Sequence, residues 1–365
     1  MNIERTDIFE FSLPLVRPLN MSGQELPHRN GLLLRLTSDD GHIGWGETSP
    51  LPGFSPESFE EARSALVSLR NWLTGREVLP SLLKLDGSLA VWLGSHRVPG
   101  TVRFGVETAV LSLLSDAAGK PPARLMTERY LETVLVNGLV IGGSDVTAAV
   151  RQLQREGYRA VKMKVARSEV RTDIERTQDA YHELGDGVPL RLDANRGWEF
   201  DQAVAFARGI DDCRIAYIEE PLRDPTRLHE FVETTGLPIA LDESMVDMTP
   251  EKLAEIPVPT AIVLKPSRLG SLEQTVNLAR TAHRRRIQVV FSSCFESSVG
   301  IGSLVQLASA FGSLGIPCGL DTNSWFETDL LAEPVRPLNG RVGMGRAWQA
   351  LKTLRIELLT EVTGV

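Results

Sequence analysis

The first hundred or so residues combine extended and helical patterns in no regular order. An apolar strand pattern at residues 31–36 (GLLLRL) is followed by a turn at residues 38–41 (SDDG) and resumes at residues 44–46, which predicts an antiparallel meander. A Pro- and Gly-rich loop then leads into helical patterns at residues 57–73 and 102–118. This region is therefore predicted to be a mixed α/β unit.

From about residue 134 the pattern changes to short, apolar, β-branched runs, each followed by an amphipathic stretch of helical period. The eight predicted strands are residues 134–140, 160–164, 190–193, 215–219, 239–242, 261–265, 289–292 and 316–321. The predicted helices between them include residues 145–155, 171–184, 200–210, 224–234, 272–285 and 301–311. This alternation is typical of parallel βαβ units, and eight such strands close a TIM-like barrel; an open doubly wound sheet is the competing architecture.

Charged side chains close most of these strands. The acids are Asp193, Glu219 and Asp242, on three consecutive strands. In a barrel the C-terminal strand ends form the active site, so these carboxylates are expected to converge there. Close carboxylates repel one another unless a cation lies between them, and an all-oxygen site that leaves room for substrate and water suits Mg²⁺. The sequence predicts a magnesium site.

Lysines flank these acids along the chain. Only 7 of the 39 basic residues are lysine, and three of them, Lys162, Lys164 and Lys265, lie at predicted strand ends. A buried lysine can lose its proton near neutral pH, whereas arginine cannot, so a lysine here can act as a general base. Lys162 and Lys164 occupy alternate positions of one strand and face the same side, so one can tune the other. Since a metal-bound carboxylate acidifies the adjacent carbon, we expect proton abstraction next to a carboxylate.

Composition and charge exclude several classes of protein. The net charge of −8 and the pI of about 5.4 argue against nucleic-acid binding. The N-terminus lacks the pattern of a secretory signal, and no apolar run is long enough to span a membrane, so a cytoplasmic protein without a membrane partner is predicted. The cysteines are too few and scattered for a disulfide framework or a zinc site. Walker, GxGxxG and GxSxG motifs do not occur.

The strand-end motifs resemble those of the enolase superfamily, in its muconate-lactonizing subgroup. The motifs, in the family's order, are residues 161–164 (VKMK), 192–198 (LDANRGW), 218–221 (IEEP), 241–244 (LDES) and 264–266 (LKP). Three further stretches make the chain most similar to the o-succinylbenzoate synthase family: residues 44–55 (GWGETSPLPGFS), 292–300 (SSCFESSVG) and 319–322 (GLDT). The resemblance runs over almost the whole chain.

The resemblance implies an architecture and a set of site residues. The fold would be a modified TIM barrel, (β/α)7β, over residues 126–326, closed by an α+β capping domain from residues 1–125 with residues 327–365 packing back on it. Mg²⁺, with Mn²⁺ as a substitute, would be held by Asp193, Glu219 and Asp242. Lys164 would be the base, Lys265 would lie opposite, and Lys162 would hold the pKa of Lys164 down. The implied substrate contacts are Asn195, the cap-loop residues Ser22 and Gly53, and, at a succinyl arm, Glu296, Ser297 and Ser298.

The resemblance also implies a reaction on a small-molecule carboxylate. It is the syn dehydration of 2-succinyl-6-hydroxy-2,4-cyclohexadiene-1-carboxylate to 2-succinylbenzoate, in menaquinone or phylloquinone synthesis. An N-acylamino acid racemase or dipeptide epimerase uses the same metal and two opposed lysines and is the alternative, with a muconate-type cycloisomerase as a third variant. A binding protein whose carboxylates hold a structural ion is the non-enzyme alternative. The sequence leaves the oligomeric state open, and a monomer is compatible with it.

Overall fold

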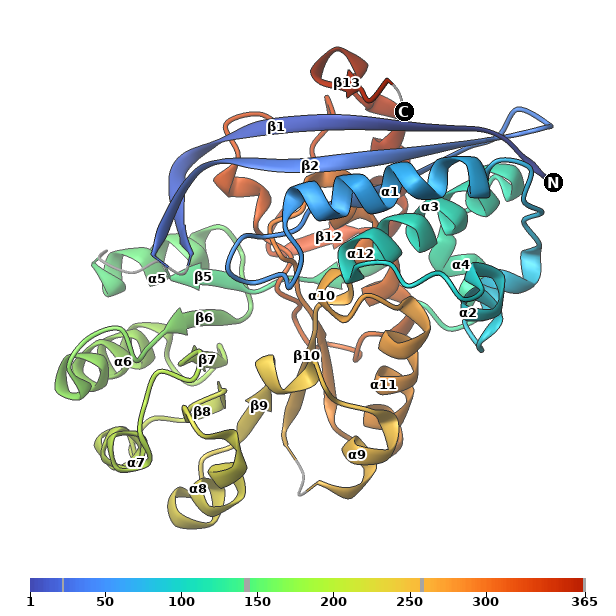
Figure 1. The fold of residues 1–365 in the computed structure, drawn as a ribbon. Coiled ribbons are helices and arrows are strands. Elements are labelled where there is room, and N and C mark those ends of the chain that lie inside the picture. The colour runs from blue at the N-terminus through green and yellow to red at the C-terminus, as the bar shows by residue number, and fades with distance from the viewer. Residues whose placement is uncertain (22, 141–144, 257–258, 364–365) are drawn as a thin grey trace.

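The N-terminal layer of the molecule is an antiparallel sheet with helices packed on it (Figure 1). The computed structural model describes residues 1–21, 23–140, 145–256 and 259–363. Two long strands, β1 (Ile3–Met21) and β2 (Gln24–Ser38), form a hairpin, and β3 (Ile43–Thr48) pairs with β2, as the predicted meander requires. The last strand, β13 (Thr360–Glu361), pairs with β1, so the C-terminal tail returns to this sheet.

Two helices cover this sheet. A capping residue explains where the first begins, and a glycine explains how closely the second packs. Helix α1 (Phe59–Leu73) begins at Ser58, whose hydroxyl accepts from the backbone of Glu61 while the Glu61 carboxylate accepts from the backbone of Ser58. Helix α3 (Gly100–Ala118) lies directly on β3, where a Cβ on Gly46 would come within 1.9 Å of the Gly105 carbonyl oxygen. Glycine is therefore required at position 46. The remaining short elements here are η1 (Pro80–Lys84), α2 (Ser88–Leu93) and α4 (Pro122–Met126).

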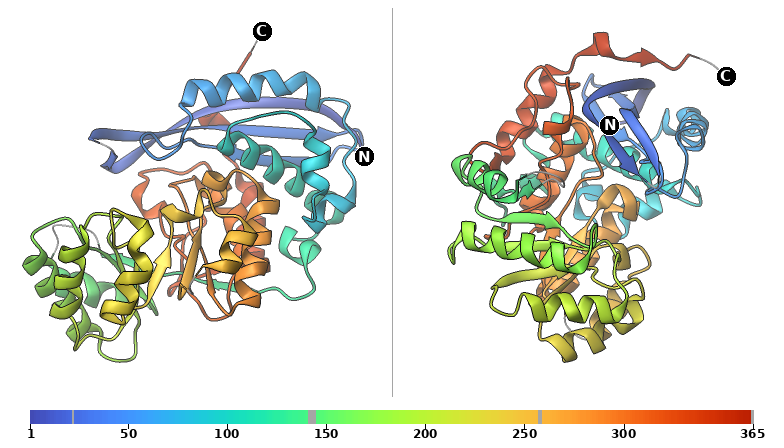
Figure 2. Two further views of the ribbon diagram at one scale, coloured as in Figure 1. Left: turned by 60° about the horizontal axis from the view of Figure 1, so that its bottom comes forward. Right: turned by 90° about the vertical axis from the view of Figure 1, so that its left-hand side faces the viewer.

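Below this layer the described residues form a curled, seven-stranded parallel sheet with helices outside it (Figures 1 and 2). The strands are β5 (Gly138–Val140), β6 (Val161–Lys164), β7 (Leu190–Asp193), β8 (Ile215–Glu219), β9 (Ile239–Leu241), β10 (Ala261–Leu264) and β11 (Gln288–Phe291). The helices are α5 (Val146–Arg155), α6 (Val170–Leu184), α7 (Phe200–Gly209), α8 (Leu228–Thr235), α9 (Pro250–Glu255), α10 (Pro266–Leu269), α11 (Leu272–Arg284) and α12 (Ser298–Phe311).

The strand order is sequential, from β5 to β11, which confirms the barrel and not the doubly wound sheet, whose order reverses. The predicted eighth strand, residues 316–321, makes only isolated bridges, but these join the two edges of the sheet. Gly319 N donates to Phe291 O at 2.8 Å, and Asn137 N, directly before β5, donates to Cys318 O at 3.0 Å. The segment thus closes the ring as the eighth strand of a modified TIM barrel.

The structure differs from the predicted elements at several places. The predicted strand 134–140 is split, because β4 (Thr133–Leu135) turns aside to pair with β12 (Arg341–Gly343) and only β5 enters the barrel. The predicted helix 224–234 begins with a 3-10 turn, η2 (Pro225–Arg227), before α8. Elements that the sequence analysis did not identify include α13 (Met344–Ala350) and the turns η3 (Glu243–Met245), η4 (Asn323–Trp325), η5 (Leu351–Thr353) and η6 (Ile356–Leu358). The domain boundaries at residues 125/126 and 326/327 stay predictions.

Buried carboxylates join the N-terminal layer to the barrel at helix N-termini. Glu107 of α3 accepts from Leu272 N, at the start of barrel helix α11, at 2.6 Å. In the opposite direction, Glu273 of α11 accepts from Leu89 N and Ala90 N, at the start of α2, at 2.7 and 3.0 Å. Negative charge is favourable at these positions because the first N–H groups of a helix lack partners within it.

Glu47 of β3 makes the most extensive of these links. Its carboxylate accepts from Ser297 N at 2.9 Å, from Ser297 Oγ at 2.6 Å and from Gly300 N at 2.8 Å, all at the start of α12. Ser49 Oγ donates to it at 2.6 Å. Nearby, the buried Arg29 of β2 donates to the carbonyl oxygens of Ser49 and Pro50 and, at 3.2 Å, to that of Cys294 in the barrel. The N-terminal layer and the barrel thus share three helix ends.

Glu107 is expected to make the stability of the chain depend on pH. Burial raises its pKa to about 7, against the lowering effect of Arg103. The folded state therefore holds the extra proton between about pH 4.5 and 7, so this contribution is fully present below pH 4.5 and is lost as pH rises through 7. We expect the difference in unfolding free energy between wild type and Glu107→Gln to fall by about 2 kcal/mol from pH 5 to pH 8 in urea titrations. A constant difference would contradict this assignment.

Among the described residues no helix combines the length and the apolar character that crossing a bilayer requires.

Candidate active site

A cavity of about 490 Å³ opens at the C-terminal ends of the barrel strands. The N-terminal layer lies over this end (Figure 2) and contributes five lining residues: Asn20, Met21, Leu51, Gly53 and Phe54. The barrel contributes Lys162, Lys164, Asp193, Glu219 and Lys265, among others. The predicted contact residue Gly53 thus lines the cavity, while Ser22 lies outside the described residues. The polar strand ends lie beneath two segments of the N-terminal layer, the end of β1 and the loop around residues 51–54, which cover the cavity.

Strand register brings the three predicted metal ligands side by side. Asp193 pairs with Glu219 across β7 and β8, and Asp242 directly follows β9. All three residues are buried, with at most 3% of their surface exposed. β8 and the short β9 contain no other charged side chain, as β10 contains none, because barrel strands are enclosed between the interior and the helices; β7 also contains the buried Arg191. Asp193 and Glu219 thus line the cavity, whereas Asp242 is absent from the described lining and is paired with Lys265, which belongs to it.

The three lysines contact these acids in different ways. The ammonium of Lys162 lies 2.8 Å from both Asp193 Oδ2 and Glu219 Oε2. Lys265 donates a hydrogen bond to Asp242. The amine of Lys164 is 3.7 Å from Asp193 Oδ2, and 39% of its side chain is exposed, compared with 16% for Lys162 and 14% for Lys265. Lys164 is thus the lysine of the three that reaches furthest into the open cavity.

The surroundings shift the pKa values of the three lysine amines in different directions. Burial lowers the pKa of Lys164, and the neighbouring charges of Lys162, Arg167 and Lys265 add to this effect against Asp193. Burial alone would also lower the pKa of Lys162, but the Asp193 and Glu219 carboxylates raise it well above its usual range. Asp242 likewise raises the pKa of Lys265 against the effect of burial. Lys164 is the amine suited to be a base, and the other two are suited to remain ammonium groups.

The carboxylates form a donor set of the kind that hard divalent cations prefer. Burial and the nearby Asp193 raise the pKa of Glu219 to about 8, although Lys162 opposes this, so additional positive charge would favour its ionised form. In the arrangement seen, no three Asp, Glu, His or Cys side chains of the described ranges converge on one point. The ammonium groups of Lys162 and Lys265 are paired with the acids instead. Three buried carboxylates at adjacent strand ends supply the oxygen donors that Mg²⁺ prefers, so the donor set fits this ion.

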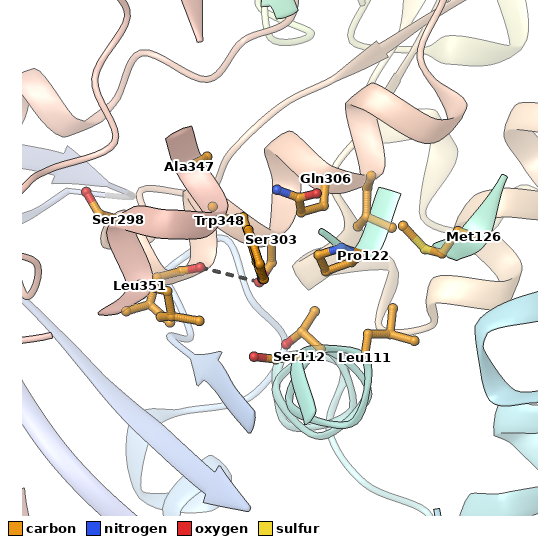
Figure 3. A pocket seen from close by; sticks show the side chains of 14 residues that line it. Leu111, Ser112, Pro122, Met126, Ser298, Ser303, Gln306, Ala347, Trp348 and Leu351 are labelled. Atoms are coloured by element: carbon orange, nitrogen blue, oxygen red, sulfur yellow. Dashed lines mark hydrogen bonds between the residues drawn. The ribbon is translucent and has the colours of Figure 1, made fainter. Parts of the chain in front are cut away.

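The three residues predicted to contact the succinyl arm follow β11 in the chain and do not line the cavity. Glu296, Ser297 and Ser298 are buried and are absent from the described cavity lining. Ser267 Oγ donates to Glu296 at 2.6 Å, and Ser297 is bound to Glu47. Ser298 lines a separate, largely apolar pocket between α3, α12 and α13 (Figure 3). A role for these three in substrate contact therefore stays a prediction.

The structure adds cavity residues that the sequence analysis missed. Arg268 lies one helical turn after Lys265 on α10 and lines the cavity. The ring of Phe54, from the covering loop, lies 3.9 Å from the Arg268 guanidinium carbon and 4.9 Å from Lys265 Nζ. Such contacts favour the ring over the two cations. The helical spacing of three residues from Lys265 was the available signal for Arg268.

Two family descriptions match the chain. Residues 145–347 match the family described as enolase C-terminal domain-like, and residues 3–91 match the MenC N-terminal domain. The o-succinylbenzoate synthase of Pasteurella multocida is 34% identical over 328 residues, covering 88% of this chain and 89% of that protein. The o-succinylbenzoate synthase of Pectobacterium atrosepticum is 32% identical over 362 residues, covering 95% and 100%.

Solved structures share the fold at lower identity. The L-Ala-D/L-Glu epimerase from Bacillus subtilis superposes with a TM-score of 0.82 at 23% identity, over 94% of this chain and 96% of that chain. A muconate lactonizing enzyme from Pseudomonas fluorescens gives a TM-score of 0.82 at 21% identity, over 97% and 99%. At this identity the likeness establishes the architecture, a capped modified barrel, and nothing of the substrate.

Proposed function

Because this chain belongs to the o-succinylbenzoate synthase family of the enolase superfamily, we propose that it is a lyase of menaquinone synthesis. It would dehydrate 2-succinyl-6-hydroxy-2,4-cyclohexadiene-1-carboxylate to 2-succinylbenzoate. The observation that carries the chemistry is the contrast among the cavity lysines. Lys164 is accessible and has a lowered pKa, whereas Lys162 and Lys265 are held as cations by buried carboxylates.

Each lysine has a separate task in the proposed reaction. Lys164 removes the proton from the carbon next to the ring carboxylate, and the Lys265 ammonium stabilises the negative charge that develops on that carboxylate. The protonated Lys164 then gives its proton to the departing hydroxyl group, which leaves as water as the ring becomes aromatic. One amine thus serves as base and then as acid on the same face of the ring. Lys162 contributes positive charge that favours the neutral form of Lys164.

A divalent ion is the proposed cofactor. Asp193, Glu219 and Asp242 would hold Mg²⁺, with Mn²⁺ as a substitute. When bound, the ion supplies positive charge to the substrate carboxylate and so acidifies the adjacent carbon. The chain itself contributes the dry surroundings, because Phe54 and the covering loops line the cavity over the lysines. Excluding water strengthens the electrostatic contribution of every charge in the site.

Racemisation is the alternative reaction, because a racemase also uses two opposed lysines. It needs the second lysine to gain and lose a proton during turnover. Lys265 donates its hydrogen bond to Asp242, a carboxylate that would also hold Mg²⁺, so this contact does not separate the two reactions. The choice of dehydration rests on the family to which the chain belongs.

The deciding experiment follows the ultraviolet absorbance of the cyclohexadiene substrate. With the purified chain and Mg²⁺ we expect rapid loss of absorbance, no loss after EDTA treatment, and recovery when Mg²⁺ or Mn²⁺ is added back in excess. An N-succinylamino acid in D₂O serves as the competing substrate, and its rate of α-proton exchange is expected to be lower than the rate of dehydration. A folded, metal-loaded chain that leaves the cyclohexadiene unchanged would contradict the proposal.

A further inference from the structure

Lys164 is held by a side-chain amide. Asn195 Oδ1 accepts a hydrogen bond from Lys164 Nζ at 2.6 Å, much closer than the 3.7 Å that separates this amine from Asp193. Asn195 follows β7 and Lys164 ends β6, so the contact crosses between adjacent strand ends. Among the described side chains, the amide of Asn195 is therefore the group that fixes where the amine of Lys164 lies.

The orientation of this amide is determined by its neighbours. Its oxygen accepts from two nitrogen donors, since Arg167 also donates to Oδ1 at 3.2 Å. Its nitrogen donates to Glu243 Oε1 at 3.2 Å. The flipped amide would place an N–H group against the Arg167 guanidinium, which has no acceptor, and an oxygen against a carboxylate, so both contacts would become unfavourable. Glu243 thus keeps the acceptor side of Asn195 turned toward Lys164.

Of the two carboxylate oxygens of Glu243, Oε1 accepts the hydrogen bond from Asn195. In the described part of the chain its second oxygen, Oε2, is buried without a hydrogen-bond partner. Burying an unpaired carboxylate oxygen is unfavourable, and such groups in native proteins call for an explanation. The backbone is strained at Asn195, the partner of Glu243, and at Arg196. Both residues have a positive φ, 43° and 57°, a conformation that favours glycine. Unfavourable local features concentrated at one point are typical of functional sites.

We propose that Asn195 and Glu243 are positioning residues, which hold the Lys164 amine at one point in the cavity through a Glu243–Asn195–Lys164 hydrogen-bond chain. The inference rests on the proposed function for the role of Lys164. Proton transfer requires the amine within hydrogen-bonding distance of the substrate proton, and a mobile lysine spends little time there. Loss of the chain is therefore expected to lower kcat and leave KM nearly unchanged.

Four variants test this arrangement. Asn195→Ala removes the acceptor, and we expect kcat to fall about 30-fold with KM within about twofold of wild type. Glu243→Gln lets the amide flip, and Asn195→Asp places a carboxylate against Glu243; each is expected to lower kcat about tenfold. The double variant Asn195→Asp/Glu243→Gln keeps the total charge and restores matched donors and acceptors, but its new carboxylate raises the pKa of Lys164, so kcat should return to within about threefold of wild type at the high-pH plateau of its pH profile. Glu233→Gln, on the exposed face of α8, is the control for removing one carboxylate.

A second measurement does not depend on turnover. The acylation rate of Lys164 at fixed pH, measured by mass spectrometry relative to exposed Lys120, is expected to rise at least about threefold in Asn195→Ala, because the amine is released from its hydrogen bond. Mg²⁺ binding and the unfolding temperature should stay near wild type, since the backbone N of Asn195, and not its side chain, contacts Asp193.

The outcomes separate the two proposals. If the wild-type chain does not dehydrate the cyclohexadiene, the proposed function is wrong, and the acylation rate still decides whether Asn195 holds Lys164. If wild type is active but Asn195→Ala raises KM and keeps kcat, Asn195 contacts substrate and the inference is overturned. A double variant that is no more active than the worse single variant even at its high-pH plateau, or an unchanged acylation rate, overturns it as well.

Discussion

Replacing Lys164 with alanine is expected to lower kcat for dehydration by about 10⁴-fold at saturating Mg²⁺. General acid–base catalysis by a positioned side chain contributes about 10²- to 10⁴-fold, and the upper value applies here because one amine is proposed to take the proton and then return it. No neighbour can substitute, since Lys162 is held by two carboxylates at 2.8 Å and Lys265 by Asp242. Steady-state absorbance assays at high enzyme concentration measure the effect.

The variant is expected to fold and to bind Mg²⁺ as wild type does. The Lys164 side chain is partly exposed in the cavity, and its removal leaves Asp193, Glu219 and their contacts with Lys162 in place. Lys120→Ala, at an exposed position, is the matched control and should be fully active. Activity of Lys164→Ala above a tenth of the wild-type value, in protein free of wild-type contamination, would rule out Lys164 as the base.

Replacing Glu47 with alanine is expected to lower the free energy of unfolding by about 4 kcal/mol. The change removes a buried carboxylate that accepts from Ser297 N, Ser297 Oγ, Gly300 N and Ser49 Oγ. Those donors would stay buried without a partner, at a cost of about 1–3 kcal/mol each before relaxation and water entry reduce the sum. The buried guanidinium of Arg29 would also lose a nearby negative charge.

Urea titrations with circular dichroism would measure this loss. Glu47→Gln retains one acceptor oxygen and is expected to lose about half as much stability. Exposed Glu333→Ala is the control and should change the unfolding free energy by less than about 0.5 kcal/mol. A Glu47→Ala variant as stable as this control would show that α12 does not depend on the carboxylate from the N-terminal layer.

The strand ends were predictable because their signal is local. An apolar run that ends in a charge, repeated on consecutive strands, locates Asp193, Glu219 and Lys164 without knowledge of any distant contact, and parallel register then brings them together. Alternation along a strand likewise predicts that Lys162 and Lys164 face the same way.

Other features could not be predicted from local pattern. The polar run after β11 suggests cavity contacts for Glu296 and Ser298, but Phe295 adopts a left-handed conformation, with φ of 61°, at the point where the chain turns. Glu296 then meets Ser267, a neighbour 29 positions away. The contact of Glu273 with Leu89 spans 184 positions, so no sequence period indicates it.

The shared helix ends also restrict how this protein can be recombined with its relatives. Glu47 and Glu107 of the N-terminal layer, and Glu273 of the barrel, each need a helix start at a matching place in the other part. A chimaera made by exchanging the whole N-terminal layer would keep each contact only where the donor chain supplies the matching acid or helix start. Substitutions confined to the loops above the cavity leave all three contacts intact, so small changes there can alter the cavity without disturbing how the layer is attached to the barrel.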